Sequence, residues 1–509
     1  MAKYRQTRQP GHAVRVSRRW IAASGLAVVL SATTMAAQSQ PDLIRAVRDG
    51  RLDVARGLLD HGADPNTAQG DGATALHHAA HRDDLDAASL LLGAGAAVSV
   101  ANQLGATPLW LAARNGSAAM ARHLLEAGAD ADAPLTMGET PVMTAARSGD
   151  LETVRLLLAH GAEVNAVEHE RQQSALMWAV AQRHSAVAQL LIDHGADVHA
   201  RTAVWDQLEN TAGNTNPIGN YRKLNGASTP LHFAARHGDV HTARVLVDAG
   251  ADVNYTAADG TSALVIAAHS GHGALGIYLL EQGADANASE AGYTALHAAV
   301  LRSQVDLAAA LLDHGADTNA VLEHGTPGRR FSADYSLRYQ WIGANAFWLA
   351  AKYGELDILQ RLAQHGADPF ATPDNGMSSL QAAMGITQST ENRRNRVGVP
   401  PPDHRAAEQL TLELARIALD LGVDVNTTDD RGNTALHFAV RQSYESVVQR
   451  LADAGADLDA VNDRDDTPLS LANSAQPLPG SDESGTRPAI AALLQSLGAT
   501  ADTDTTTGR

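Results

Sequence analysis

Histidine is the residue type from which a metal site or an acid–base catalyst could most readily be built in this sequence. The chain has 22 histidines and no cysteine, which excludes disulfides, thiolate zinc sites and cysteine nucleophiles. The segment H-E-R-Q-Q that starts at His169 begins like the zinc-protease motif H-E-x-x-H, but Gln173 stands where the second histidine ligand is required. His77, His78 and His81 could share a helix face, where a metal would bind only adventitiously. We predict no metal site.

Other catalytic motifs are missing from the sequence. It has no G-x-S-x-G nucleophile elbow, no phosphate-binding G-x-x-x-x-G-K-[ST] loop and no dinucleotide-binding glycine fingerprint between a strand and a helix. Acidic residues are abundant, but they fall in turns and on the outer sides of helices, where charged groups are normally solvated. We therefore predict no catalytic residue and no cofactor, and a protein that is not an enzyme.

The segments that carry the histidines recur along the chain. The tripeptide G-A-D, or a close variant, has its glycine at positions 62, 95, 128, 161, 195, 250, 283, 315, 366, 422 and 455, and most spacings are 32 to 34 residues. A tetrad of the type T-P-L-H follows about ten residues later and contains His77, His232, His297 and His437. The histidines thus recur because the unit recurs.

One unit illustrates why this pattern predicts two helices. The hydroxyl of Thr107 can cap a helix start, and Pro108 suits the first helical position because its missing N–H costs nothing there. A turn at Gly116 is followed by apolar residues at helical spacing, and Gly128 can end this second helix in the left-handed conformation. The stretch Ala129–Glu139 then forms an extended finger that leads to the next unit.

The period near 33 residues and the T-P-L-H-x-A pattern resemble those of ankyrin repeats over nearly all of residues 41–498. The resemblance implies an all-α ankyrin-repeat solenoid of about 12 helix-turn-helix units at residues 41–500, in which each pair buries its apolar side against its neighbours. In that family the tetrad histidines make hydrogen bonds between repeats, and the residue after the tetrad faces a concave groove. The less regular segments Pro41–Asp71 and Asp466–Thr500 are expected to cap the two ends.

Four inserts interrupt the period. They lie at about residues 201–225, 322–342, 386–408 and 476–487. The first two fall between a G-A-D segment and the next helix start, so they should lengthen fingers. The other two fall between the two helices of a unit and should emerge at the opposite end of the stack.

We expect a protein partner to bind in the concave groove and on the first two inserts. Trp, Tyr and Arg are frequent anchors of interfaces, and loops on a rigid scaffold often carry function. The alternative is that the aromatic residues only fold the inserts back onto the solenoid. The groove candidates are Trp178, Phe233, Ile266 and Tyr293. The insert candidates are Trp205, Tyr221, Arg329, Arg330, Phe331, Tyr335, Arg338, Tyr339 and Trp341.

The N-terminus has the pattern of a signal peptide at residues 1–37. A basic region ending at Arg19 precedes the apolar stretch Trp20–Leu30 and the small-residue segment Ser31–Ala37. This pattern predicts export from a bacterial cell, to the periplasm or the medium. The alternative is an uncleaved leader that tethers the chain to the inner membrane.

The charge limits the classes of partner. The net charge is −18 and becomes −24 once the six basic residues of the leader are removed, which disfavours nucleic acid. We therefore expect a monomer that binds protein, has no membrane span after signal cleavage, and ends in a disordered tail at residues 501–509. Two other functions remain open: a ligand-binding protein or hydrolase with a pocket walled by the inserts, and a membrane-tethered structural spacer.

Overall fold

The computed structural model describes residues 42–210, 220–326, 337–385, 403–474, 476–477, 484–485 and 487–500. The described residues from Leu43 onward belong to one compact unit, which holds all the helices and strands below. The expected signal peptide, the expected disordered tail and the middle of each insert lie outside the described residues, so those expectations stay predictions.

Twelve pairs of antiparallel helices follow one another along the described chain, which confirms the all-α solenoid. The first helices of the pairs, here called inner helices, are α1 (Leu43–Arg48), α3 (Ala75–Arg82), α5 (Pro108–Asn115), α7 (Pro141–Ser148), α9 (Ala175–Ala181), α11 (Pro230–His237), α13 (Ala263–Ser270), α15 (Ala295–Leu301), α17 (Ala346–Tyr353), α19 (Ser379–Ala383), α21 (Ala435–Gln442) and α23 (Pro468–Asn473). The second, outer helices are α2 (Leu52–Asp60), α4 (Leu85–Gly93), α6 (Ala118–Glu126), α8 (Leu151–Ala159), α10 (Ser185–Asp193), α12 (Val240–Asp248), α14 (Gly273–Glu281), α16 (Val305–Asp313), α18 (Leu356–Gln364), α20 (His404–Asp420), α22 (Glu445–Asp453) and α24 (Pro488–Leu497).

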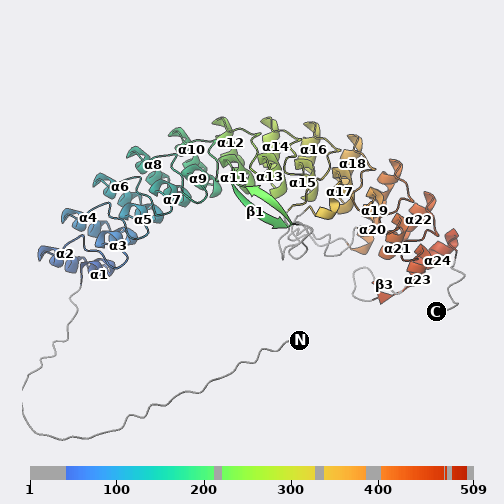
Figure 1. The fold of residues 1–509 in the computed structure, drawn as a ribbon, viewed down its shortest axis with the longest axis horizontal. Helices are drawn as coiled ribbons and strands as arrows, with labels where there is room; N and C mark the ends of the chain where they lie inside the picture. Colours follow the sequence, from blue (N-terminus) through green and yellow to red (C-terminus); the bar gives the residue numbers. More distant parts are fainter. Residues whose placement is uncertain are drawn as a thin grey trace, which may run out of the picture. The chain divides into compact units, whose positions relative to one another are not determined.

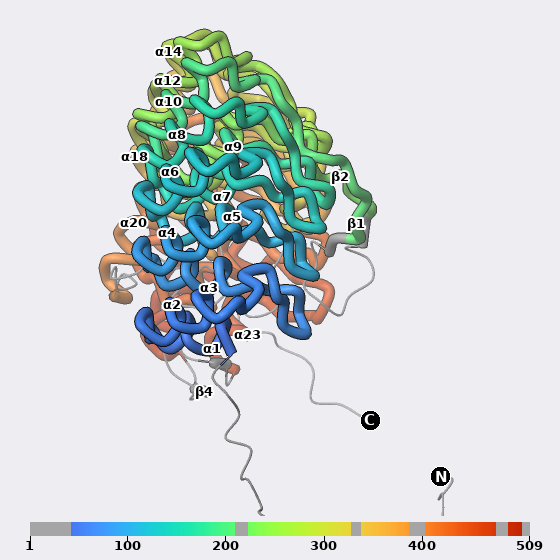
Figure 2. The backbone as a smooth tube through the Cα atoms, turned by 90° about the vertical axis from the view of Figure 1, so that its left-hand side faces the viewer, coloured from blue at the N-terminus to red at the C-terminus, as the bar shows by residue number. Residues whose placement is uncertain are grey.

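The pairs build three layers. Inner helices pack on inner helices and outer helices on outer helices of the neighbouring pairs (Figure 1). Figure 2 shows the outer helices on one side, the inner helices in the middle and the finger turns on the other side. Each pair therefore exposes the finger-side face of its inner helix, and these faces adjoin along the row. Among the described residues, no helix is both long and apolar enough to cross a bilayer.

The helices begin and end at the capping residues that the sequence indicated. The hydroxyl of Thr107 accepts a hydrogen bond from the N–H of Trp110 at 3.2 Å, and Pro108 is the first residue of α5. Gly116 ends α5 with φ +68°, and Gly128 follows α6 with φ +88°. A residue with a Cβ at such a position costs about 1–2 kcal/mol, which explains why glycine recurs there.

Small residues form the contact between successive pairs. Ala112 and Ala113 of α5 are fully buried, as are Ala145 and Ala146 of α7, so the inner helices approach closely. Leucines such as Leu124 fill the space between inner and outer helices, and each stabilises the fold by about 1.5–3 kcal/mol through burial. No pair could bury this surface alone, so the stability of the row comes from stacking.

The tetrad position links each repeat to the next. Nε2 of His77 and the carbonyl oxygen of Ala106 are 2.9 Å apart, and His232 and His437 make the same bond to Thr261 and Asp466 at 3.1 Å. This confirms the expected bonds between repeats for three of the four tetrad histidines. These bonds fix the spacing of the inner helices.

His297 is the exception to that expectation. Its Nε2 is buried and forms no hydrogen bond of ordinary distance and angle with any described residue, although the carbonyl of Ala344, at the equivalent position of the next repeat, lies near it and opposes the lowering of its pKa by burial. Two other tetrad side chains make the bond instead. Nε1 of Trp348 donates to the carbonyl of Met377 at 2.7 Å, and Nε2 of Gln381 donates to that of Asn433 at 2.6 Å.

An asparagine in most fingers joins the G-A-D segments. The side chain of Asn165 donates to the carbonyl of Gly195 at 2.9 Å and accepts from the N–H of Asp197 at 2.8 Å. Asn254, Asn287 and Asn426 make the same two bonds one repeat further along. Asn319 accepts from the N–H of Asp368 at 2.7 Å, so this connection continues across the second insert.

The first insert forms a β-hairpin that an all-α prediction did not include. Strands β1 (Trp205–Asn210) and β2 (Asn220–Asn225) pair antiparallel, with Trp205 opposite Asn225. The hairpin projects on the finger side, away from the outer helices (Figure 2). The apolar residues are three apart in both strands, at Trp205 and Leu208 and at Tyr221 and Leu224, so the period of two that is typical of strands is missing here.

The other inserts alter the ends of their helices. In the second, Thr326 and Leu337 join the two ends of the segment 327–336 through two hydrogen bonds of 2.8 Å, and a 3-10 helix, η2, spans Tyr339–Trp341. In the third, expected at 386–408, Asp403 caps α20 and residues 404–408 are helical, so the end of the insert lengthens this outer helix to 17 residues. In the fourth, β3 (Gln476–Pro477) pairs with β4 (Ser484–Gly485).

Candidate binding surface

The three apolar groove candidates lie on consecutive inner helices. Trp178 is on α9, Phe233 on α11 and Ile266 on α13, and each is partly buried against the core while part of its surface stays accessible. Tyr293 is also partly buried and lies in the finger before α15. The structure therefore places the four on adjoining repeats of the same face.

Polar neighbours hold Trp178 in place. Its Nε1 donates to the side-chain oxygen of Gln173 at 2.8 Å, and the Arg147 guanidinium lies 4.7 Å from the centre of the indole ring. Arg147 also donates to Glu139 at 3.0 Å. Because the indole N–H is already bonded, the accessible part of Trp178 offers an oriented apolar surface.

Tyr293 lies beside a neutral histidine. The rings of Tyr293 and His269 are 5.9 Å apart between centres. Burial lowers the pKa of His269 to about 4, and the positive charges of Arg302 and Lys223 act in the same direction. Near neutral pH this part of the groove therefore carries an uncharged imidazole.

The hairpin turns its aromatic residue toward the body. The Arg171 guanidinium lies 4.2 Å from the centre of the Trp205 ring, and Lys223 forms an ion pair of 2.8 Å with Asp259 in the following finger. The opposite face exposes Leu208 and Leu224 instead. The backbone of Tyr221 is part of β2. Trp205 thus helps to fold the insert back, the alternative that the sequence left open.

The second insert is described only in part. Arg329, Arg330, Phe331 and Tyr335 lie outside the described residues, so their expected role is untested.

Trp341 is 5% exposed and contacts the rings of Trp348 and Tyr353 at 6.4 and 5.6 Å between centres. Its ring therefore belongs to the core and does not stand free as an interface anchor. Arg338 and Tyr339 are partly buried beside it.

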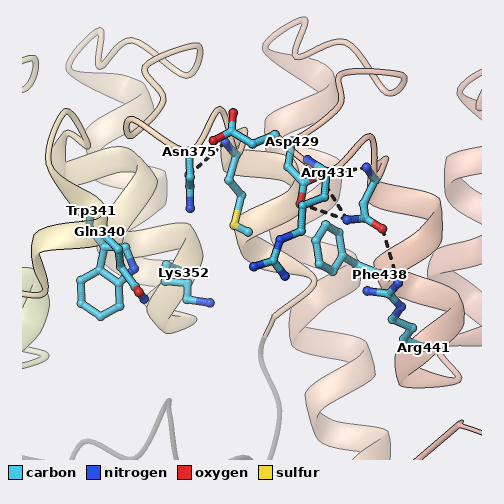
Figure 3. A pocket seen from close by; sticks show the side chains of 11 residues that line it. Gln340, Trp341, Lys352, Asn375, Asp429, Arg431, Phe438 and Arg441 are labelled. Carbon is cyan, nitrogen blue, oxygen red and sulfur yellow. Dashed lines mark hydrogen bonds between the residues drawn. The ribbon is translucent and has the colours of Figure 1, made fainter. Parts of the chain in front are cut away.

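A cavity of about 450 Å³ lies next to this insert (Figure 3). It extends from η2 and α17 across the finger before α19 to the finger before α21 and α21 itself. Its lining residues are Gln340, Trp341, Lys352, Asn375, Met377, Asp429, Asp430, Arg431, Asn433, Phe438 and Arg441. The sequence left open a pocket walled by the inserts, and this cavity adjoins the second insert at Gln340 and Trp341.

The cavity exists because the inner helix between its walls is short. With five residues, α19 is the shortest inner helix among those described, since the third insert leaves the repeat there. The residue seven places after the capping residue is Lys352 in α17 and Arg441 in α21, but Gly385 in the repeat between them. A residue without a side chain thus lies between two basic residues of the neighbouring repeats.

Positive charge predominates among the groups that point into the cavity. Lys352 and Arg431 reach into the space between Trp341 and Phe438 (Figure 3). The carboxylate of Asp429 instead accepts hydrogen bonds from the backbone N–H groups of Arg431 and Asn433, at 3.0 and 2.8 Å.

Arg441 forms the far wall of the cavity. Its guanidinium donates to the side-chain oxygen of Asn433 at 3.4 Å. Burial lowers its pKa, although the nearby Asp466 opposes this.

The described lining contains no histidine, serine, threonine or cysteine that could act as a nucleophile or general base. Across the described residues, no group of three or more His, Asp or Glu side chains has a metal-binding arrangement. The chemistry that the cavity offers is recognition of an anion beside apolar surface.

Comparison with known proteins identifies the family. The profile described as "Ankyrin repeats (3 copies)" matches residues 43–134, 131–202, 213–290 and 231–321. Profiles described as "Ankyrin repeats (many copies)" match residues 347–387 and 417–472. The chain belongs to the ankyrin-repeat family, whose arrays are generally protein-interaction modules and not enzymes.

The similar proteins contain more than this array. Among them is the E3 ubiquitin-protein ligase KEG of Arabidopsis thaliana, 28% identical over 48% of this chain and 16% of its own length. Human neurogenic locus notch homolog protein 1 is 33% identical over 26% of this chain and 6% of its own length. The chain thus spans less than a fifth of each of these relatives.

One similar solved structure is the human ASB11 ankyrin repeat domain, 28% identical, with a TM-score of 0.39 over 48% of this chain and 98% of that one.

The cavity residues escaped the sequence analysis for a physical reason. A basic residue near the C-terminus of an inner helix is favourable in any repeat, because it interacts with the helix dipole. Lys352 and Arg441 therefore looked unremarkable. At this position Gly385 has no side chain at all, and this glycine between Lys352 and Arg441 is the feature of the sequence that indicates a gap.

Proposed function

We propose that the protein is an interaction scaffold that binds a protein partner along the exposed face of its inner helices and on the adjoining finger side. The observation that carries this proposal is the run of accessible apolar side chains at Trp178, Phe233 and Ile266 on three consecutive inner helices. Partly exposed aromatic residues on a rigid support are typical of interface hot spots.

Chemical cross-linking with the purified chain, followed by capture and mass spectrometry, tests the proposal. Phe233→Ser should reduce capture of the partner about tenfold, because it removes an aromatic anchor. The matched control is Val247→Ser on α12, the outer helix of the same pair, where the valine is also partly buried. Both variants must retain the helical circular dichroism of the wild type. Equal capture by the wild type and Phe233→Ser would overturn the groove as the binding surface.

The insert candidates are tested in the same experiment. A variant that lacks residues 327–336 removes Arg329, Arg330, Phe331 and Tyr335 but keeps Thr326 and Leu337, which join the ends of that segment. Reduced capture would support a role for these side chains in binding. Unchanged capture would restrict the interface to the groove.

The proposal includes export to the periplasm or the medium of a bacterium, and a monomeric scaffold. It rests on the basic, apolar and small-residue order of residues 1–37 and on the net charge of −18. Expression of the full chain in a bacterial host, fractionation and N-terminal mass spectrometry would test it. A chain found in the cytoplasm with residues 1–37 intact would contradict export, whereas an intact leader in the membrane fraction would support the tethered alternative.

A further inference from the structure

The cavity beside the second insert combines three features that do not occur together elsewhere in the described part of the chain. First, Gly385 provides no side chain at a position where the inner helices on both sides have a basic residue. Second, basic side chains flank the cavity, and third, one of its walls is apolar. Each feature bears on what the cavity can hold.

Its cations lie on both sides of the gap. Lys352 approaches the gap from α17, since its Nζ lies only 3.0 Å from the position that a Cβ on Gly385 would occupy. Arg441 approaches from α21, and Arg431 descends from the finger above. In the described part of the chain, no carboxylate lies within ion-pair distance of Arg431 or Arg441.

One of the two acids of the lining, Asp429, is engaged in hydrogen bonds, and neither acid lies within ion-pair distance of Arg431 or Arg441. Asp429 accepts four hydrogen bonds, from two backbone N–H groups and from the side-chain amide of Asn433 to each of its oxygens. The backbone N–H of Asp430 bonds to the carbonyl of Asn375 at 3.2 Å, which fixes the second finger against the first. The lining thus keeps its guanidinium groups available for an external anion.

The walls of the cavity determine which groups lie next to a bound anion. The ring of Phe438 lies under the Arg441 guanidinium, 6.0 Å from its centre, and Met377 is partly accessible between the fingers. A guanidinium held beside an aromatic ring binds a planar carboxylate through two parallel N–H donors. Apolar surface beside the guanidinium favours a ligand in which an acidic residue is adjacent to a residue with an apolar side chain.

We propose that this cavity binds an acidic segment of the partner protein, with a carboxylate on Arg431 and Arg441 and an adjacent apolar side chain against Phe438 and Met377. This inference rests on the proposed scaffold function and adds the chemistry of one anchoring point. On a chain with net charge −18, a local cluster of cations fixes where and in which register an acidic segment can bind.

Selection from a library of random peptides of about twelve residues on the immobilised full chain tests the inference. We expect selected peptides to be enriched in Asp or Glu next to an apolar residue. Binding of a synthetic selected peptide should weaken at least about tenfold in Arg431→Met, since a charge-assisted hydrogen bond is lost. It should also weaken between about 0.05 and about 0.3 M salt, and this salt dependence should be smaller in the variant.

Arg155→Met is the matched control, because Arg155 is an exposed arginine on outer helix α8, remote from the cavity lining. It should bind the peptide like the wild type. Arg441→Met provides a second variant on the far wall. Far-ultraviolet circular dichroism and melting temperatures establish that each variant is folded.

Several results would overturn the inference. Selected peptides without acidic enrichment would do so, as would acidic peptides that bind Arg431→Met and the wild type equally, or the absence of any selected peptide. Tighter peptide binding by a chain ending at Thr500 would identify the chain's own segment with Asp502 and Asp504 as the occupant. If the partner captured by cross-linking binds Arg431→Met, Arg441→Met and the wild type equally, the scaffold function stands and only the acidic anchor fails.

Discussion

The imidazole of His232 bridges two repeats, with Nδ1 3.2 Å from the backbone nitrogen of Thr229 and Nε2 3.1 Å from the carbonyl oxygen of Thr261. Because a backbone N–H can only donate, Nδ1 must accept, and the proton lies on Nε2, which donates to Thr261. The bridge therefore requires the neutral imidazole. Burial lowers the pKa of His232 to about 4, against the opposing effects of the Thr261 carbonyl and Asp259.

This relationship predicts acid sensitivity. The folded-state pKa lies below the unfolded value of about 6.5, so the unfolded chain binds the proton more tightly. The contribution of His232 is complete above pH about 6.5 and is lost as the pH falls toward about 4, by up to about 3 kcal/mol. Thermal unfolding between pH 7.5 and 4.5 should therefore show a falling melting temperature.

His232→Gln should flatten that dependence. Gln381 occupies the same tetrad position in the tenth pair, where its Oε1 accepts from Ser378 N–H at 2.6 Å and its Nε2 donates to the next finger. Glutamine can thus make both bonds without titrating. We expect His232→Gln to melt close to wild type at pH 7.5 and above it near pH 5, and Gln381→His to become more acid-sensitive. Parallel pH profiles for all three proteins would refute this assignment.

Gly283 is required for its backbone conformation and not for lack of space. It has φ +86°, and a Cβ there would meet nothing within 4 Å. Gly283→Ala should therefore destabilise by about 1–2 kcal/mol through left-handed strain alone. Gly57 has equally open surroundings but lies within helix α2, so Gly57→Ala should stabilise by up to about 1 kcal/mol. Urea denaturation compares the pair, and shifts of the same sign would contradict the explanation.

Trp348 and Trp110 occupy equivalent tetrad positions but differ in one hydrogen bond. The Nε1 of Trp348 donates to Met377, whereas the Nε1 of Trp110 is buried and has no hydrogen-bond partner among the described residues. Replacement by phenylalanine removes a similar volume from each. Trp348→Phe should therefore cost about 1–3 kcal/mol more than Trp110→Phe, because it leaves the Met377 carbonyl without its donor. Equal changes in melting temperature would argue against a stabilising role for this bond.

Lys223 should hold the hairpin on the body. Its partly buried ion pair with Asp259 connects β2 to the next finger, whereas Arg222 is exposed and pairs with Asp206 within the hairpin. Lys223→Met should speed hydrogen exchange of the β1 and β2 amides about tenfold, and Arg222→Met should change it much less. Similar exchange in both variants would mean that the stacking of Trp205 on Arg171 suffices to hold the hairpin.

The repeated parts of the fold were predictable from the sequence because the residues that start and end each helix are determined by their local backbone conformation. Thr107, Pro108 and Gly116 determine where α5 begins and ends, and variants of this pattern recur along the row, as at Thr229, Pro230 and Gly238 of α11. Even the bridging role of His77, His232 and His437 followed from the resemblance. The hairpin could not be predicted in this way, because its sequence occurs only once in the chain and has no counterpart in the other repeats.

The candidate site was less predictable for a different reason. Whether Trp205 and Trp341 bind a partner or pack inward depends on what lies opposite them, and this is a property of the assembled row. Trp205 meets Arg171, and Trp341 meets Trp348 and Tyr353. The cavity likewise arises from residues far apart in sequence, such as Trp341 and Arg441, together with a glycine between two basic positions.

Thr326 and Leu337 close the base of the segment 327–336, while Asn319 binds Asp368 directly. Neither connection needs the ten residues in between, and lengthening a closed loop twofold costs only about 0.6 kcal/mol. This point of the chain is therefore a site at which one inserted segment can be exchanged for another. Evolution or an engineer could swap it for another sequence, and so change what the protein recognises, while the helices on either side stay in step.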